Sequence, residues 1–274
     1  MTHLLEIDAS TLASNFAKNP FPVNHHLGDH PLLSVEAVAT LADQLPQDDI
    51  EHNRGDVDAV VADGTVDVLD DSPGEIARHI DTNGCWMVLK NIEQVQAYHE
   101  LLDTLLDEVN PLVEGREGGM NLREGYVFLS AANSTTPAHT DHEHNFLLQI
   151  RGSKQMNLGR FHDPKVEQLQ VEKMFAGQRN MDRLPDEPTA YELKPGDGVY
   201  VPPNAPHWVN NGPEVSVSLS ITFRTPITER GAVVHSMNRR LRKLKLSPRP
   251  PGEHVAIDKA KFAVNRTLKS LRRN

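Results

Sequence analysis

The sequence predicts a mainly β protein with flanking helices, in which the strands form a sandwich or a barrel. Short apolar segments separated by Gly, Pro and Asn turns follow one another between residues 126 and 223, a pattern typical of such folds. A leucine-rich helical pattern precedes these segments, and an apolar pattern with near-helical spacing follows them. The 274 residues can bury a sizeable core as one large domain, or as one domain with appended helices.

Residues 1–110 are expected to be a helical and irregular region that packs on the core. Prolines in the first 46 residues interrupt short helical stretches such as 35–44. Residues 84–89, Gly-Cys-Trp-Met-Val-Leu, have the composition of a buried strand. A helix is predicted over 95–109, because five apolar side chains share one stripe: Leu101, Leu102, Leu105, Leu106 and Val109.

The core is expected between residues 111 and 227. Its strand candidates are 126–130, 138–150, 154–158, 192–201 and 215–223. Residues 159–190 are polar and lack strand alternation, so we interpret them as an insert. The last strand alternates hydroxyl and apolar side chains. In an open sheet its hydroxyl face would meet solvent, whereas in a ligand-holding barrel it would line a polar cavity, and we favour the cavity.

Residues 228–274 are expected to be a basic C-terminal helical segment. Residues 224–274 contain 14 Lys and Arg and three Asp and Glu, a net charge of +11, whereas the first 223 residues carry −21. This split indicates either a tail that binds nucleic acid or membrane, or a basic segment that docks on an acidic body, which we favour. An apolar stripe in this segment needs cover, from the protein's own barrel or from a second copy in a homodimer. Its members are Ile257, Phe262, Val264, Leu268 and Leu271.

Composition excludes several classes of protein. No segment approaches the roughly 20 apolar residues of a membrane span. The first ten residues include Glu6 and Asp8 and lack the basic and apolar regions of a signal peptide. The single Cys85 excludes an intrachain disulfide and fits a reducing compartment, where we read it as a buried thiol. We therefore expect a cytoplasmic protein with no membrane partner.

One pair of residues suggests a metal ligand set. His139 and Asp141 are two positions apart, and in a strand such residues project to the same face. Imidazole with carboxylate suits Fe(II) and, less selectively, Mn, Co, Ni or Zn. The pair is a weak signal by itself, because the chain has 14 histidines. His142 and His144 alternate to the opposite face and are expected to lie on the exterior.

A second segment strengthens the metal hypothesis. Residues 195–207 read Pro-Gly-Asp-Gly-Val-Tyr-Val-Pro-Pro-Asn-Ala-Pro-His, in which a turn, a short strand and another turn present His207. With His139 and Asp141 it would supply two His and one carboxylate on one face of a metal. This is the facial triad of non-haem Fe(II) oxygenases, which leaves positions open for a co-substrate and O₂.

Two motifs carry a resemblance to a known family. Residues 195–211 match the second cupin motif, with Asn204 in place of its last Gly, whereas the first motif is met only partly because His-x-Asp replaces His-x-His. Residues 136–141, Thr-Pro-Ala-His-Thr-Asp, and 149–154, Gln-Ile-Arg-Gly-Ser-Lys, resemble the Jumonji-C-type (JmjC) cupin-like oxygenases. Around the metal motif they are most similar to the asparaginyl hydroxylase that inhibits hypoxia-inducible factor. The resemblance covers about a quarter of the chain.

This resemblance implies a double-stranded β-helix (cupin or jelly-roll) core, so that residues 111–227 would be a cupin/JmjC-like domain with Fe(II) and 2-oxoglutarate as cofactor and co-substrate. The implied metal ligands are His139, Asp141 and His207. The implied 2-oxoglutarate residues are Lys154, Thr136 and Asn145, with Thr222 where the family has an Asn.

Physical chemistry supports Lys154 independently. A 2-oxoglutarate chelated to iron leaves its distal carboxylate in a narrow cavity, where an unpaired charge is costly. A lysine at a strand start thirteen residues after Asp141 can face the same cavity. The alternative is a solvent-facing turn residue.

We expect an Fe(II)/2-oxoglutarate-dependent dioxygenase, a hydroxylase that couples 2-oxoglutarate decarboxylation to C–H oxidation of an unknown small-molecule or protein substrate. A metal-dependent cupin dioxygenase or isomerase that does not use 2-oxoglutarate is an alternative, and it would not need Lys154. A non-catalytic cupin-like regulator whose tail contacts nucleic acid is another. We disfavour nucleic acid as a partner because the tail lacks interleaved aromatic residues and a recognisable binding motif.

Overall fold

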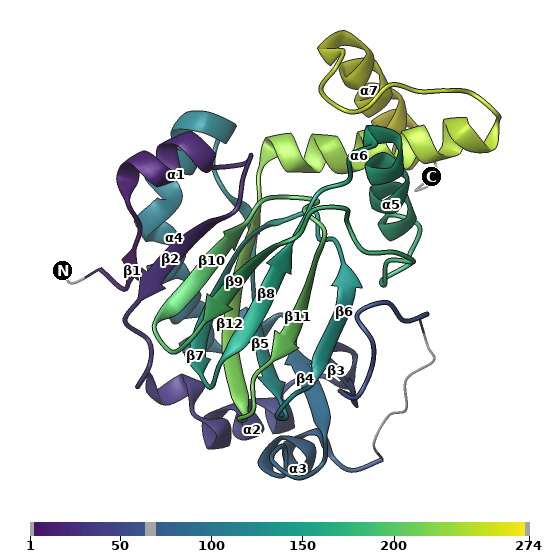
Figure 1. Cartoon of the computed structure of the whole chain (residues 1–274). Helices are drawn as coiled ribbons and strands as arrows, with labels where there is room; N and C mark the ends of the chain where they lie inside the picture. The colour runs from purple at the N-terminus through teal and green to yellow at the C-terminus, as the bar shows by residue number, and fades with distance from the viewer. Residues whose placement is uncertain (1–2, 64–69, 272–274) are drawn as a thin grey trace.

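Two antiparallel sheets form the centre of the computed structural model, which describes residues 3–63 and 70–271 (Figure 1). The large sheet has the strand order β1-β2-β10-β7-β12-β5-β4-β3, and the small sheet has the order β6-β11-β8-β9. From β5 to β12 the chain passes repeatedly between the two sheets, as in a double-stranded β-helix. The protein is therefore mainly β with flanking helices, as the sequence predicts.

The strands of the large sheet are β1 (Leu5–Glu6), β2 (Phe21–His25), β3 (Ile50–Arg54), β4 (Cys85–Leu89), β5 (Asn121–Ser130), β7 (His144–Arg151), β10 (Asp197–Val201) and β12 (Ser216–Arg224). Those of the small sheet are β6 (Thr135–His139), β8 (Lys154–Leu158), β9 (Thr189–Leu193) and β11 (His207–Asn211). The helices are α1 (Ala9–Asn15), α2 (Val35–Gln44), α3 (Pro73–Arg78), α4 (Gln96–Glu117), α5 (Pro164–Met174), α6 (Pro226–Lys243) and α7 (Val255–Leu271), with 3₁₀ turns at η1 (Pro31–Leu33), η2 (Gln47–Asp49) and η3 (Ile92–Gln94).

The N-terminal region contributes more strands than its sequence predicts. Besides β4, which the sequence indicates, β1, β2 and β3 belong to the large sheet, so this region does more than pack on the core. β2 adds to β10 with Phe21 opposite Tyr200, and β3 adds to β4. These short strands carry little periodic signal, and Pro22 lies inside one of them.

Three predicted elements have different bounds in the structure. The candidate 138–150 is two strands, because residues 140–143 form the turn between β6 and β7. The candidate 192–201 is also two strands, separated at Gly196, whose φ of 95° suits a glycine. The helix predicted over 95–109 continues past Pro111 and ends at Gly118, with φ of 83°, so that it crosses the boundary predicted at residue 110. The insert contains α5.

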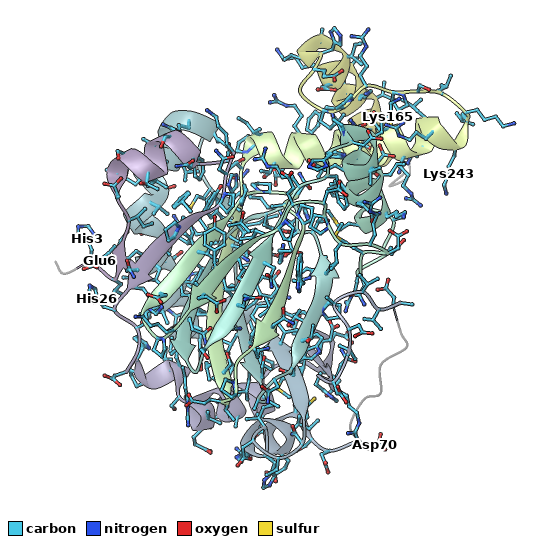
Figure 2. All side chains as sticks on the ribbon, in the orientation of Figure 1. His3, Glu6, His26, Asp70, Lys165 and Lys243 are labelled. Atoms are coloured by element: carbon cyan, nitrogen blue, oxygen red, sulfur yellow. The ribbon has the colours of Figure 1, made fainter. Side chains whose placement is uncertain are left out.

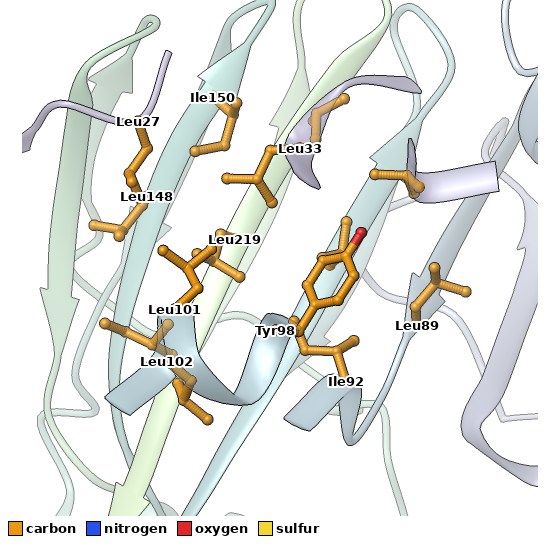
Figure 3. Close-up of a cluster of buried hydrophobic side chains, with 14 of the residues drawn as sticks. Leu27, Leu33, Leu89, Ile92, Tyr98, Leu101, Leu102, Leu148, Ile150 and Leu219 are labelled. Carbon is orange, nitrogen blue, oxygen red and sulfur yellow. The ribbon is translucent and has the colours of Figure 1, made fainter. Parts of the chain in front are cut away.

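The apolar core lies on the outer face of the large sheet, beneath α2 and α4. Figure 3 shows Leu101, Leu102 and Tyr98 of α4 packed toward side chains of the sheet. The apolar face of β12 belongs to this core, since Val217, Leu219, Ile221 and Phe223 are at most 1% exposed. Burying each such side chain contributes roughly 1.5–3 kcal/mol.

The hydroxyl face of β12 points into the space between the sheets. Ser218 Oγ donates to Gln149 Oε1 at 2.7 Å, and Ser220 Oγ donates to Asn145 Oδ1 at 2.7 Å. Ser220 and Thr222 also line the cavity described below. The prediction that the hydroxyl face of this strand lines a cavity is confirmed for Ser220 and Thr222.

The predicted exterior position of His144 is wrong. Its side chain is fully buried between the rings of Phe16 and Phe223, each with its centroid 4.8 Å away, because α1 and α4 cover this part of the sheet. Its Nδ1 lies 2.7 Å from Tyr200 Oη and its Nε2 lies 3.1 Å from Glu117 Oε2. His142 is also not exterior, since its side chain is 23% exposed. The alternation itself is respected, since His144 points away from Asp141.

Glu117 makes His144 important for stability. Although burial raises the pKa of Glu117, hydrogen bonds from His144 and Thr225 hold the pKa below its ordinary value. Replacing His144 by Phe keeps the stacking but removes the partner of a buried carboxylate. We expect a loss of about 2–4 kcal/mol in the free energy of unfolding, measured by urea denaturation. The double variant His144→Phe with Glu117→Gln should recover part of this loss. An unchanged free energy of unfolding in His144→Phe alone would contradict the prediction.

The basic C-terminal segment consists of two helices, of which α6 crosses one end of the sheets and α7 lies on α6 (Figure 1). α6 docks on the insert, because Arg242 Nε donates to both oxygens of Glu172 at 3.1 Å. α7 packs on α6 through a polar contact in which Lys261 Nζ donates to Asn238 Oδ1 at 2.6 Å. Lys243, at the end of α6, extends away from the sheets (Figure 2).

α7 leaves much of its apolar surface exposed. Ile257 and Val264 are 47% and 49% exposed, whereas Asp258 and Lys261 are below 10%. The side chains of Leu268 and Leu271, which belong to the predicted stripe, lie outside the described residues. None of the helices in the described part of the chain has the length and apolar run that a membrane crossing requires.

Candidate metal centre and cavity

The two predicted histidine ligands face each other across neighbouring strands. His139 ends β6 and His207 begins β11, and the two are direct cross-strand partners. Asp141 lies in the turn after β6 and points toward both rings. Its Oδ2 is 3.7 Å from His139 Nε2 and 3.5 Å from His207 Nε2. One ligand atom from each residue lies within 4.8 Å of the others, so the three could hold one metal ion.

Each histidine ring is oriented by a carbonyl two residues earlier in the chain. Nδ1 of His139 lies 2.7 Å from the oxygen of Pro137, and Nδ1 of His207 lies 2.9 Å from the oxygen of Ala205. Since a carbonyl only accepts, each Nδ1 carries the proton and each Nε2 is free to coordinate. Burial and the neighbouring His139 lower the pKa of His207 to about 4. Both features favour the neutral imidazole that a metal requires.

The turn that carries Asp141 is fixed from two sides. The backbone N–H of Asn204 donates to the carbonyl oxygen of Asp141 at 2.6 Å, and Asn204 adopts a left-handed φ of 64°, which Asn tolerates. On the other side, Arg224 donates from Nε and Nη2 to Oε1 of Glu143, at 3.0 and 2.7 Å. Glu143 is two residues after Asp141, so this ion pair ties the turn to the end of β12.

We expect Arg224→Ala to weaken metal binding about tenfold, because supporting partners of a metal site typically contribute 10–100-fold. The measurement is the Kd for Co(II) by calorimetry. Arg123→Ala is the matched control, since Arg123 also binds two carboxylates, Asp103 and Asp107, each at 2.7 Å, away from the cavity. Equal metal affinity in both variants would show that the Arg224 ion pair does not support Asp141.

A cavity of about 960 Å³ opens beside the three candidate ligands. Its floor and walls come from the inner faces of both sheets. Of the predicted 2-oxoglutarate residues, Thr136, Asn145, Lys154 and Thr222 all line it. The structure therefore places these four residues and the metal candidates at one cavity, which is what the sequence hypothesis requires. Their role in binding 2-oxoglutarate remains a prediction.

Lys154 is a buried cation without a carboxylate partner in the described part of the chain. It begins β8 and is 4% exposed. Its Nζ lies 6.0 Å from the centroid of the Phe128 ring, a cation–π contact. Burial lowers the pKa of Lys154 to about 7. A cavity that surrounds an unpaired ammonium is prepared for an anion. The alternative of a solvent-facing turn residue is wrong.

Several cavity residues were not predicted as site residues. Tyr126 on β5 and Glu143 line the cavity near Asp141, and Trp86 and Val88 on β4 extend its wall. Burial and the neighbouring Glu124 and acidic groups raise the pKa of Tyr126, so its hydroxyl stays protonated. The sequence shows Tyr126 only as a strand residue, and nothing local indicates that β4 adjoins a site.

Two carboxylates beside the cavity, Glu51 and Asp63, bind groups from other segments of the chain. Glu51 on β3 accepts from Lys90 Nζ at 2.6 Å and also contacts Arg179, which belongs to the insert. The backbone N–H groups of Arg179 and Asn180 donate to the carboxylate of Asp63, both at 2.8 Å. These contacts hold residues 177–180, which line the cavity, next to β3.

Cys85 takes no part in this site. It is fully buried, and burial raises the pKa of its thiol to about 11. A thiol in this state is a poor nucleophile, which agrees with the buried thiol expected from the sequence.

Comparison with known proteins is consistent with this geometry. Residues 120–230 match the family model described as the JmjC domain. None of the curated proteins matches the chain. Among solved structures, the Escherichia coli ribosomal oxygenase YcfD in complex with cobalt and 2-oxoglutarate superposes with a TM-score of 0.55 at 16% identity, covering 98% of this chain and 68% of that one. Another structure of E. coli YcfD gives 0.56 at 15% identity, covering 100% and 70%. At these identities the likeness shows the fold.

Proposed function

We propose that this chain, whose residues 120–230 match the JmjC domain model, is a JmjC-type Fe(II)- and 2-oxoglutarate-dependent oxygenase that hydroxylates its substrate. The observation that carries the proposal is the position of Lys154. This cation is buried, unpaired with any described carboxylate, and on the same cavity as His139, Asp141 and His207. A cupin enzyme without 2-oxoglutarate would have no use for it. The distal carboxylate of 2-oxoglutarate would offset the cost of burying the Lys154 ammonium.

The residues present fit both groups. The two Nε2 atoms and the Asp141 carboxylate form the two-histidine, one-carboxylate set that suits Fe(II). When bound, iron with 2-oxoglutarate supplies O₂ activation and the oxidising equivalents for C–H oxidation. Lys154 would hold the distal carboxylate of 2-oxoglutarate, and Thr136, on the same sheet, lines the same cavity. Asn145 and Thr222, which are cross-strand partners, would line the co-substrate space from the large sheet.

Apolar side chains enclose part of the cavity. Trp86, Val88 and Phe128 provide an apolar wall between the sheets, and residues 177–180 of the insert also line the cavity. Such enclosure positions the target carbon and limits side reactions. The E. coli YcfD structure in complex with cobalt and 2-oxoglutarate shares the fold and supports the same pairing of metal and co-substrate here.

Formation of succinate tests the reaction. Purified protein with Fe(II), ascorbate, 2-oxoglutarate and O₂ should convert 2-oxoglutarate to succinate, slowly without substrate. An accepted substrate should speed this conversion and gain the mass of one oxygen atom. Binding of metal without binding of 2-oxoglutarate would instead support a cupin dioxygenase or isomerase.

We further propose a homodimer through α7, in the cytoplasm, where the lone buried Cys85 would stay reduced. Ile257 and Val264 present an exposed apolar stripe. The surrounding segment is strongly basic and the rest of the chain strongly acidic, so the segment of one copy complements the body of another.

Ile257→Glu with Val264→Glu should convert the dimer to a monomer in light scattering, because the change places charges in an apolar contact. Lys259→Glu, an exposed position on the same helix, is the control and should leave most of the dimer intact. A wild-type chain that is monomeric at high concentration would contradict the dimer proposal.

A further inference from the structure

Strand β3 is an open edge of the large sheet. It is the last strand in the order, and β4 is its only strand neighbour among the described residues. Natural proteins usually protect such edges, because a row of unpaired N–H and C=O groups is a template for another strand. β1, at the opposite edge, is only two residues long, and Glu6 there pairs with His26 at 2.8 Å (Figure 2). β3 spans five residues.

The register shows which backbone groups of β3 point outward. In an antiparallel ladder, residues alternate between those bonded to the neighbouring strand and those directed away from it. The N–H of Lys90 donates to the oxygen of Asp49, and the N–H of Gly55 donates to the oxygen of Gly84. The residues bonded to β4 are therefore at odd positions, and His52 and Arg54 direct their N–H and C=O groups to the open edge. No hydrogen bond joins these outward groups to any described residue.

The open edge borders the cavity of the metal centre. The consecutive residues 50–53 all line the cavity. Side chains of neighbouring strand residues point to opposite faces, so a cavity that touches four in a row meets the backbone edge as well. The same continuous cavity contains His139, Asp141 and His207.

The charges around this edge are largely satisfied within the protein. Glu51 is held by Lys90 and Arg179, and Asp63 accepts two backbone N–H groups. The polar groups left without a partner on β3 are its outward backbone groups and the buried Nδ1 of His52. The natural complement of these backbone groups is the backbone of another extended chain.

We propose that the free edge of β3 is the docking site for an extended segment of a polypeptide substrate. The segment adds as a further strand beside β3, and one of its side chains enters the cavity toward the metal centre. Residues 177–180 of the insert line the same cavity, and Arg179 there contacts Glu51 of β3. Backbone pairing supplies affinity, and the cavity wall of Trp86 and Val88 selects the side chain. This inference rests on the proposed oxygenase function and adds where its substrate binds.

The test uses a positional-scanning library of decapeptides with the Fe(II)-loaded full chain and 2-oxoglutarate. The readouts are peptide-dependent succinate formation and a gain of one oxygen atom in peptide mass. Active peptides are then resynthesised with single backbone N-methyl groups. Strand addition predicts that N-methylation raises KM about tenfold at every second position and has little effect between them, because alternate N–H groups face β3.

A variant tests the same contact from the side of the protein. Arg54→Pro removes one outward N–H at an edge-strand position, where proline is tolerated, and should raise the peptide KM about tenfold. Arg54→Ala, which keeps the N–H, should not. The 2-oxoglutarate Kd of both variants should equal that of wild type, which also shows that they fold.

Two results would overturn the inference while leaving the oxygenase function standing. One is 2-oxoglutarate binding with no active peptide in the library, which would indicate a small-molecule substrate. The other is an active peptide whose N-methyl scan lacks the two-residue period and whose KM is unchanged in Arg54→Pro. Absence of 2-oxoglutarate binding would overturn the proposed function itself.

Discussion

Asp141→Ala is expected to lower the affinity for Fe(II) or Co(II) by more than about 100-fold, and to abolish succinate formation. The carboxylate is the only anionic ligand in the candidate set, and its Oδ2 lies within 3.7 Å of both histidine Nε2 atoms. Without it, two neutral imidazoles remain, which bind divalent metals weakly. Residues that only support a metal ligand typically contribute 10–100-fold to metal affinity, so a residue that binds the metal directly should contribute more.

The matched control is Asp103→Ala, which removes a half-exposed carboxylate paired with Arg123 on the far side of β5. Calorimetry with Co(II) should give the wild-type Kd for this control. Asp141→Ala with near-wild-type metal affinity would mean that the ion binds elsewhere, and the triad would lose its assigned role.

Lys154→Met is expected to raise the Kd for 2-oxoglutarate about 100-fold or more while leaving metal affinity unchanged. Removing one partner of a buried ion pair typically costs about 3–5 kcal/mol, because it leaves an uncompensated charge. In the ligand-free protein the same substitution should not destabilise the fold, since it removes a buried cation that has no carboxylate partner among the described residues. A large drop in melting temperature without 2-oxoglutarate, with unchanged affinity for it, would make Lys154 a structural residue.

The protonation of Lys154 should also make 2-oxoglutarate binding dependent on pH. Burial lowers the pKa of Lys154 from 10.5 to about 7, and only the ammonium form attracts a carboxylate. Above pH 7, binding must therefore take up a proton, so the affinity should fall by up to about tenfold per pH unit. Between pH 7 and about 10, the unfolded chain holds a proton that the ligand-free folded chain lacks. The stability of the ligand-free protein should therefore rise with pH over this range. Lys154→Met should remove both effects.

The parts of the fold that the sequence predicts well are those with local periodic signals. The leucine stripe marks α4, and the turn at Pro195 and Gly196 marks the start of β10. His139, Asp141 and His207 could be identified because they lie in compact motifs of fixed spacing. Lys154 is implied by the family resemblance, and the charge that a cavity for a dicarboxylate requires supports it.

The remaining features depend on contacts between segments distant in sequence. β2 and β3 are strands because β10 and β4 offer them edges, not because of their own alternation. The burial of His144 depends on α1 and α4, and the Arg224–Glu143 pair joins residues 81 positions apart. Such partners leave no pattern within a window of one strand or helix.

Anaerobic titration of the Fe(II)-loaded protein with 2-oxoglutarate tests the central proposal most directly, with Lys154→Met beside the wild type. Chelation of 2-oxoglutarate to iron gives a weak visible metal-to-ligand charge-transfer band. We predict that this band saturates in the wild type and needs about 100-fold more 2-oxoglutarate in the variant. Iron bound through His139, Asp141 and His207 with no band at any 2-oxoglutarate concentration would contradict the proposal, and would favour a cupin enzyme that does not use this co-substrate.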